Sequence, residues 1–176
     1  SLIKRCYMDK GNVHIYCGKG RGKTTAAIGH AMRAASAGQT AIIVQFFKGR
    51  EEDDLAFLKQ LEPQIKLFRF EKFRGNFDDL TPEQRQEETQ NMKNGFNYAK
   101  KVLVTEECDV LILDEVLGLL PCGIITADDL RQLIHAKSDG MKLIMTGSYD
   151  AREIWDVVDE VTELIPRKSS IDKEIQ

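Results

Sequence analysis

The sequence predicts an α/β fold in which about six mainly parallel strands form one sheet with helices on both faces. Short runs of β-branched and apolar residues alternate with longer segments of helical period, as is typical of a parallel sheet. The run 109–114 (DVLILD) is apolar without alternation, as expected of a central strand covered on both faces. The chain has 176 residues, of which 42% are hydrophobic. We therefore expect a single domain over residues 1–176, with its core at about 12–165.

Strands are predicted where short β-rich runs are bounded by turn or polar residues. The run 65–70 (IKLFRF) alternates apolar and polar residues, so we expect it nearer an edge of the sheet than 109–114. The six predicted strands are 12–17, 41–47, 65–70, 109–114, 141–146 and 160–165.

The first helix is predicted at 23–37 and should end at Gly38. Its apolar face is expected to contain Ile28, Ala31, Met32 and Ala35. A second helix is expected at about 52–61, where leucines recur at helical spacing just before a proline.

The clearest helix start is TPEQ at 81–84, because Thr81 can cap the helix and Gln84 can complete a capping box. That helix should run to about residue 104. Two further helices are expected, one from near Thr126 and one at about 150–158, where Trp155 has the spacing of a core residue.

Composition excludes several classes of protein. Lys and Arg number 25 against 28 Asp and Glu, so the net charge of -3 disfavours nonspecific nucleic-acid binding. No apolar run approaches the roughly 20 residues that cross a bilayer, and the first residues do not resemble a signal peptide. The four cysteines form no C-x-x-C pair, which argues against structural zinc. We expect a soluble, cytoplasmic protein without a membrane or nucleic-acid partner.

A glycine-rich turn, CGKGRGKTT at 17–25, follows the first predicted strand and opens the first helix. Glycines at 18, 20 and 22 let backbone N–H groups approach phosphates at the positive end of a helix. A lysine and a threonine next to them are placed to meet the β- and γ-phosphates and Mg²⁺. Cysteine occupies the position of the first glycine of the common motif. The predicted nucleotide-binding residues are Gly18, Lys19, Gly20, Arg21, Gly22, Lys23, Thr24 and Thr25.

A second part of the predicted site is LILDE at 111–115, an apolar strand that ends in two carboxylates. Parallel strands present ligands at their carboxyl edge, so Asp114 and Glu115, with Thr24, are the metal candidates. Either carboxylate could instead cap the following helix, and the sequence does not divide their roles. Gln45, at the end of the second predicted strand, could contact nucleotide or be an exposed strand-end residue.

Three blocks of sequence resemble the P-loop ATP:corrinoid adenosyltransferases, also called cob(I)alamin or cob(I)yrinic acid a,c-diamide adenosyltransferases. They are HIYCGKGRGKTTAAIGHAMRAASAG at 14–38, IIVQFFKG at 42–49 and CDVLILDE at 108–115. A weaker similarity covers 143–164. The resemblance therefore implies a P-loop NTPase-like fold over about 12–165.

The resemblance also implies a reaction. Co(I) of a corrinoid, either cobalamin or a precursor, attacks the 5′ carbon of ATP, and the whole triphosphate leaves. Lys23 and Glu115 are then the catalytic candidates, with Mg²⁺ as cofactor, an electron donor that reduces cobalt as a partner, and a homodimer as the assembly. The other hypotheses are a P-loop ATPase or phosphotransferase that releases ADP, and a nonenzymatic nucleotide-binding module.

Relatives in this family pack aromatic residues of a loop after the third strand against the corrin. The corresponding stretch of this chain reads EKFRGNFDD, so the resemblance makes Phe73 and Phe77 the corrinoid-binding candidates. The alternative is that both phenylalanines anchor the loop in the core.

Overall fold

The computed structural model describes residues 12–47, 56–73 and 75–170. Six strands form one sheet in the order β3-β2-β4-β5-β1-β6, and every neighbouring pair is parallel. The predicted α/β class is confirmed, and so are all six predicted strands to within two residues at each end. The strands are β1 Val13–Cys17, β2 Ala41–Gln45, β3 Ile65–Arg69, β4 Val110–Asp114, β5 Lys142–Thr146 and β6 Glu160–Glu163.

The hydrophobic pattern of the strands predicted their places in the sheet. All five residues of β4 are buried, and it lies between β2 and β5. In contrast, only the first residue of β3, Ile65, is buried, and β3 is an edge strand. A strand with helices on both sides has no face left for polar residues, which is why the alternation disappears at the centre.

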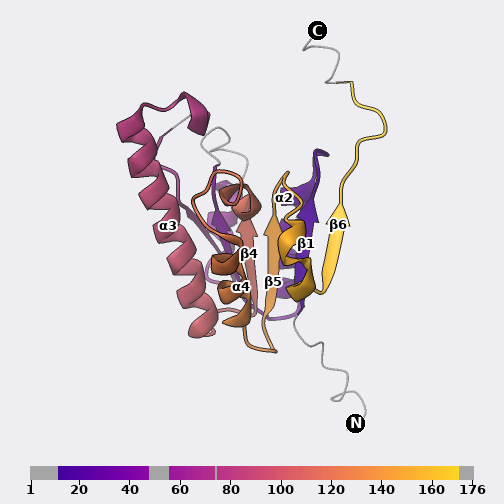
Figure 1. Cartoon of the computed structure of the whole chain (residues 1–176). Coiled ribbons are helices and arrows are strands. Elements are labelled where there is room, and N and C mark those ends of the chain that lie inside the picture. Colours follow the sequence, from indigo (N-terminus) through magenta and orange to yellow (C-terminus); the bar gives the residue numbers. More distant parts are fainter. Residues whose placement is uncertain (1–11, 48–55, 74, 171–176) are drawn as a thin grey trace, which may run out of the picture.

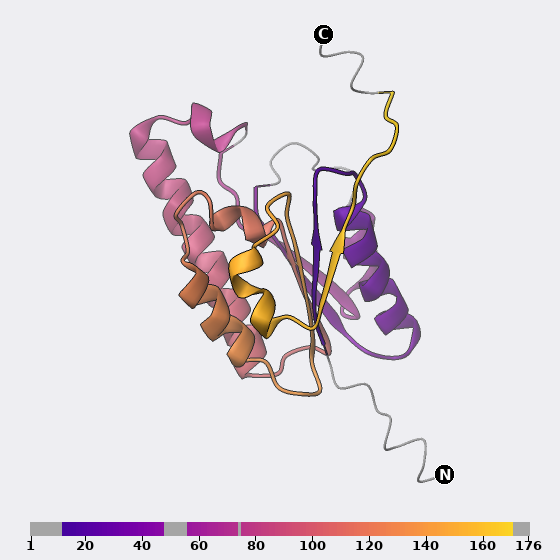
Figure 2. The same ribbon diagram turned by 45° about the vertical axis from the view of Figure 1, so that its right-hand side comes forward.

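Helices cover both faces of the sheet (Figure 1). Figure 2 shows α2 (Lys23–Ser36) on one face, with α3 (Pro82–Val104) and α4 (Ala127–His135) on the other. Each face has its own hydrophobic core, the larger one beneath α3 and α4 and the smaller one beneath α2. Because all strands are parallel, their carboxyl ends lie along a single edge, where the loops after β1, β2 and β4 meet.

Both helix starts with a capping threonine are confirmed. At the start of α3, Thr81 Oγ1 accepts from the Gln84 N–H and the Gln84 side chain accepts from the Thr81 N–H. Thr126 and Asp129 form the same reciprocal pair at the start of α4. These bonds satisfy two N–H groups that a helix terminus otherwise leaves without partners.

The predicted face of α2 is partly wrong. The residues buried against the sheet are Ala27, Ala31 and Ala34, whereas Met32 is 41% exposed. Small side chains at spacings of three and four residues let the helix lie close to the strands, so the alanines rather than the larger residues decide which face is buried.

Two other predicted helices differ from the observed elements. Of the segment 52–61, residues 52–55 lie outside the described parts of the chain, and Ala56–Leu61 is a 3-10 helix. The segment 150–158 contains a 3-10 helix at Arg152–Val157. Trp155 in that element is not a core residue as predicted: it is 36% exposed, and its indole N–H donates to the Asp150 carbonyl at 2.7 Å.

A polar cluster of His14, Tyr16, His30 and Lys142 lies on the α2 side of the sheet. The His14 and Tyr16 rings stack with centroids 4.1 Å apart, and His30 Nε2 is 2.7 Å from the Tyr16 hydroxyl. Lys142 Nζ lies 3.2 Å from His30 Nδ1. Because an ammonium group can only donate, His30 accepts this bond and is held in its neutral form. Burial lowers the pKa of both histidines below the ordinary value of 6.5.

Candidate active site

The glycine-rich turn joins β1 to α2 and leaves the start of the helix open to an anion. Gly22 is the N-cap with φ 102°, no side chain caps the helix, and its first turn contains no acidic residue. The first N–H groups of α2 therefore have no competing carboxylate nearby in the helix itself. Lys23 Nζ donates to the carbonyls of Gly18 at 2.7 Å and Gly20 at 2.9 Å. The lysine side chain thus crosses the loop and links its two carbonyl groups.

Glycine is required in this loop because the chain segment after β6 lies against it. A Cβ atom at Gly18 would lie 2.6 Å from the Leu164 carbonyl oxygen, and one at Gly20 would lie 2.7 Å from it. Two backbone bonds hold the contact: Gly20 N–H donates to Leu164 O and Leu164 N–H donates to Cys17 O, both at 2.9 Å. Cys17, in place of the motif's first glycine, is 1% exposed, and burial raises its thiol pKa. It is a core residue.

Asp114 lies at the centre of the site, at the end of β4, and is fully buried. Its Oδ1 accepts hydrogen bonds from the hydroxyls of Thr24 at 2.9 Å and Thr146 at 2.7 Å. Its Oδ2 accepts from Gln45 Nε2 at 3.0 Å. The structure therefore brings together predicted residues from α2, β2 and β4. Three donors compensate the burial of one carboxylate.

Glu115 follows Asp114 and has the left-handed conformation, with φ 65°. This conformation is uncommon for a residue with a side chain and turns the chain sharply out of the strand. Glu115 is the N-cap of the 3-10 helix Val116–Leu119, but its side chain makes no capping bond. The alternative that Glu115 caps the following helix through its side chain is therefore wrong.

Thr146, at the end of β5, is a site residue that sequence reasoning missed. Its hydroxyl donates to Asp114 and accepts from the Glu115 N–H at 2.9 Å, so one side chain fixes both consecutive carboxylate residues. Thr146 is fully buried. The available signal was its position at the end of a predicted strand, because parallel strands present ligands at their carboxyl ends.

Gln45 is 1% exposed and is therefore not an exposed strand-end residue. Its amide nitrogen donates to Asp114, and its amide oxygen accepts from Arg69 Nε at 3.0 Å. These two bonds connect the ends of three neighbouring strands, β3, β2 and β4. Lys48, which follows the same strand, lies outside the described residues.

The oxygen donors of Thr24, Asp114 and Glu115 suit Mg²⁺. Among the described residues, no group of three or more His, Cys, Asp or Glu side chains could hold a metal ion. Mg²⁺ in nucleotide sites is bound by one or two carboxylates together with phosphates and water, so a small set of protein ligands fits this ion.

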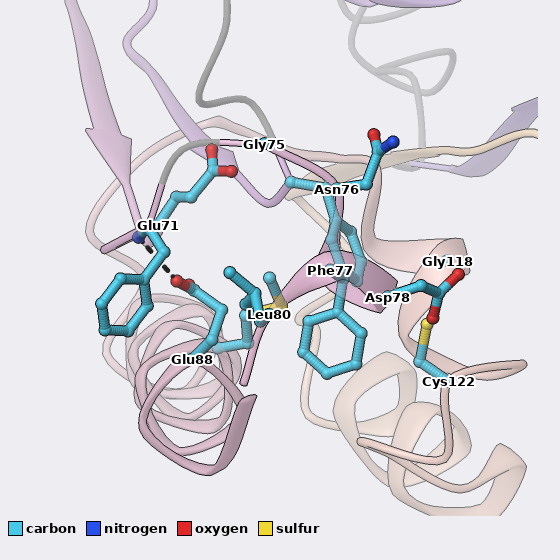
Figure 3. A pocket seen from close by; sticks show the side chains of 12 residues that line it. Glu71, Gly75, Asn76, Phe77, Asp78, Leu80, Glu88, Gly118 and Cys122 are labelled. Atoms are coloured by element: carbon cyan, nitrogen blue, oxygen red, sulfur yellow. Dashed lines mark hydrogen bonds between the residues drawn. The ribbon is translucent and has the colours of Figure 1, made fainter. Parts of the chain in front are cut away.

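A cavity of about 320 Å³ opens beside the ends of β2 and β4. Figure 3 shows the residues around it, including Phe77, Glu88, Gly118 and Cys122. Phe73 and Phe77 both line this cavity, as does Phe47, which sequence reasoning missed. The Phe47 and Phe77 rings meet edge to face with centroids 6.1 Å apart. The structure therefore brings the two predicted aromatic residues to one hollow, and Phe77 also packs against the hydrophobic core.

Phe47 and Gly118 form one wall of this cavity. Phe47 has φ 56°, so the chain turns sharply at the end of β2. A Cβ atom at Gly118 would lie 3.4 Å from the Phe47 ring. This is an ordinary van der Waals distance, so the Phe47 ring lies beside the backbone of Gly118 without requiring a glycine there.

The fold and the loop define an α/β domain of the P-loop NTPase-like type. Comparison with known sequences gives the family. The family described as ATP:corrinoid adenosyltransferase BtuR/CobO/CobP matches residues 9–176. The chain belongs to this family, as the resemblance of the three sequence blocks indicated.

Three similar proteins bear the same family name. The corrinoid adenosyltransferase of Escherichia coli strain K12 is 29% identical over 164 residues, which cover 93% of this chain and 81% of that protein. Corrinoid adenosyltransferase CobA of Salmonella typhimurium is 29% identical over 170 residues, covering 97% and 84%. The corrinoid adenosyltransferase of Pseudomonas aeruginosa is 23% identical over 157 residues, covering 89% and 75%. The family is one of transferases that act on ATP and a corrinoid.

Proposed function

We propose that this chain transfers the 5′-deoxyadenosyl group of MgATP to the Co(I) centre of a corrinoid. In this reaction a cobalt–carbon bond forms, the bond between C5′ and the triphosphate oxygen breaks, and the triphosphate leaves with the electron pair. The observation that carries the proposal is the family match over residues 9–176 together with a loop whose lysine and glycines have the geometry of a phosphate site.

In the proposed reaction the loop stabilises the leaving triphosphate. The N–H groups at the start of α2 and the side chains of Lys19, Arg21 and Thr25 would surround its oxygens. Lys23, whose ammonium group lies at the carbonyls of Gly18 and Gly20, would add a positive charge. Stabilisation of a leaving group at a fixed anion site lowers the barrier without a general base.

Mg²⁺, when bound, supplies positive charge to the departing phosphates. Thr24, Asp114 and Glu115 would hold it, the threonine through its hydroxyl. Asp114 is held in place by the hydroxyls of Thr24 and Thr146 and by the Gln45 amide. We infer that Asp114 acts on the ion through Thr24 and bound water, whereas Gln45 acts by orienting Asp114.

The corrinoid is proposed to bind at the cavity beside Phe73 and Phe77. Aromatic faces pack well against a flat macrocycle and keep water from the reacting atoms. The cavity is smaller than a corrinoid, so it would receive only part of the molecule. Co(I) is already a strong nucleophile, and the task of the chain is to hold it near the ribose.

The decisive experiment is an anaerobic incubation with MgATP and chemically reduced cob(I)alamin, with phosphate products separated by ion chromatography. Tripolyphosphate together with a new cobalt–carbon bond in the absorption spectrum is the expected result. ADP and phosphate would instead indicate an ATPase or phosphotransferase, and ATP binding without any product would indicate a nucleotide-sensing module.

Two variants test the phosphate loop and the corrinoid cavity separately. Lys23→Ala should abolish ATP binding while the protein stays folded, and normal ATP affinity would refute the proposed loop function. Phe77→Ala should reduce activity that starts from Co(II), while full activity would show that Phe77 only anchors its loop.

We further propose a homodimer, a cytoplasmic location and a separate electron donor for cobalt. Among the described residues no helix is both long and apolar enough to cross a membrane.

A further inference from the structure

A buried carboxylate on α3 holds the loop that carries the aromatic cavity residues. Glu88 lies in the second turn of α3 and is 2% exposed. Its neighbours along the helix are mostly polar and solvent-accessible, so a glutamate at this position would ordinarily lie in solvent. Burying a carboxylate is costly unless hydrogen bonds compensate it, and the contacts of Glu88 show what compensates it.

The shortest hydrogen bonds of Glu88 come from backbone N–H groups of the segment after β3, and the Asn91 side chain donates a longer bond of 3.5 Å to Oε1. Glu88 Oε2 accepts from the Phe73 N–H at 2.8 Å and the Lys72 N–H at 3.0 Å, and Oε1 lies 3.2 Å from the Lys72 nitrogen. The dashed line in Figure 3 ends at the Glu88 carboxylate. This segment has left the sheet, so no strand satisfies these N–H groups. One side chain therefore replaces the missing strand partner with charge-assisted bonds.

A second contact fits α3 to the same segment. A Cβ atom at Gly95 would lie 2.6–2.9 Å from atoms of the Phe70 side chain. The absence of a side chain at Gly95 lets Phe70 pack directly on the helix, two turns from Glu88. The segment from 70 to 73 is thus fixed to α3 at both of its ends. Phe73, the last residue of this segment, lines the cavity.

We propose that Glu88 is a positioning residue for corrinoid binding, because it fixes the backbone of Lys72 and Phe73 and so sets the aromatic wall of the cavity. The inference rests on the proposed function, since it assigns the cavity to the corrinoid. Glu88 lies in α3 and makes none of its hydrogen bonds to the phosphate loop. Loss of the Glu88 carboxylate should therefore weaken corrinoid binding and leave nucleotide binding unchanged.

The test is Glu88→Gln, which keeps the shape of the side chain but places an amide N–H₂ group against backbone donors. Glu87→Gln is the matched control: Glu87 is the neighbouring glutamate, it is exposed, and its carboxylate pairs with the ammonium group of the same Lys72. Steady-state tripolyphosphate release is measured for wild type and both variants, with corrinoid and ATP varied in turn. Exchange of the Lys72 and Phe73 amide protons is followed by NMR without any substrate.

For Glu88→Gln we expect a KM for the corrinoid that is raised about tenfold or more, the loss typical of hydrogen bonds to a charged group. The KM for ATP should stay within about twofold of wild type, and both amides should exchange faster. Glu87→Gln should match wild type in all three measurements. A role in stability alone would raise both KM values together, and this result would overturn the proposal.

Wild-type turnover distinguishes failure of the proposed function from failure of the proposed role of Glu88. If wild type releases no tripolyphosphate, the proposed function is refuted and this inference with it. If wild type is active and Glu88→Gln has an unchanged corrinoid KM or unchanged amide exchange, only the inference is refuted. Should Glu88→Gln fail to fold, Glu88→Asp keeps the charge but shortens the reach by one methylene. A corrinoid KM equal to wild type in that variant also overturns the proposal.

Discussion

Thr146→Val is expected to destabilise the protein because one hydroxyl serves both carboxylate residues at the end of β4. The substitution keeps the branched shape of the side chain and removes only its hydrogen bonding. Asp114 would lose the 2.7 Å bond to its Oδ1, and the Glu115 N–H would lose its acceptor at 2.9 Å. Thr146 is fully buried, so water does not readily replace the hydroxyl.

The magnitude follows from these two losses. A hydrogen bond to a charged group contributes about 1.5–3 kcal/mol, and a buried N–H left without a partner costs about 1–3 kcal/mol. Relaxation of the surroundings reduces the sum, so we expect the free energy of unfolding to fall by about 3 kcal/mol. With a urea m-value of about 2 kcal/mol/M, the unfolding midpoint should fall by roughly 1.5 M.

Urea unfolding followed by circular dichroism measures this change. Thr105→Val is the matched control, because Thr105 is exposed and its hydroxyl only donates to the Lys101 carbonyl in the last turn of α3. The control should change the free energy of unfolding by less than about 0.5 kcal/mol. Equal midpoints for Thr146→Val and wild type would refute the argument that the hydroxyl organises this end of β4.

Three further predictions concern other parts of the chain. Gly29→Ala should stabilise the protein by about 0.5–1 kcal/mol in urea unfolding, because the added Cβ would point into open space on a helix. Gly18→Ala should lower the affinity for nucleotide measured by calorimetry, because the added Cβ would lie 2.6 Å from a backbone carbonyl oxygen. Burial lowers the pKa of His14 and His30 below 6.5, so the unfolded chain binds more protons below that pH. The contribution of the two neutral histidines to the free energy of unfolding should be fully present above pH 6.5 and should fall as the pH drops toward their lowered pKa values. The fall should be at most about 1.4 kcal/mol per pH unit for each histidine. A free energy of unfolding that stays flat from about pH 7.5 to 5.5 would contradict this. Cys122 lines the cavity and is exposed, so bound corrinoid should slow its alkylation. Partial desolvation of the thiol raises its pKa, so the rate is measured by peptide mapping at alkaline pH. Equal rates with and without corrinoid would count against this binding site.

Local sequence signals predicted most of the fold. The capping sequence at Thr81 and the uninterrupted apolar run of β4 depend only on neighbouring residues, and both predictions were confirmed. Predictions failed where a longer-range contact decides the outcome. Met32 has helical spacing with apolar residues, yet the alanines of α2 lie against the sheet because only small side chains allow that close approach. Trp155 belongs to a short 3-10 helix whose geometry turns its ring to the surface.

The candidate site was predictable to the extent that a motif marks it. The loop at 17–25 and the LILDE strand are contiguous signals, and the structure brings Thr24 and Asp114 together at 2.9 Å. Thr146 and Glu88 carry no such signal, since each acts on a segment distant in sequence and each is an ordinary residue of its strand or helix. Their roles arise only when the topology places β5 beside β4, and α3 beside the segment after β3.

The arrangement of the two carboxylates bears on which reaction the P-loop supports. Asp114 is fully buried and its two oxygens accept three hydrogen bonds from protein groups, so it is poorly placed to take a proton from water. Glu115 is half-buried and turned out of the strand by its left-handed backbone, and a hydrolytic enzyme would need this residue as its base. Adenosyl transfer needs no base, so Glu115→Gln should slow the corrinoid-dependent release of tripolyphosphate only by weakening the Mg²⁺ site, and a raised Mg²⁺ concentration should restore most of the rate. An ATPase would lose its turnover in the same variant, and the rate of ADP release against that of tripolyphosphate therefore distinguishes the two chemistries at one residue.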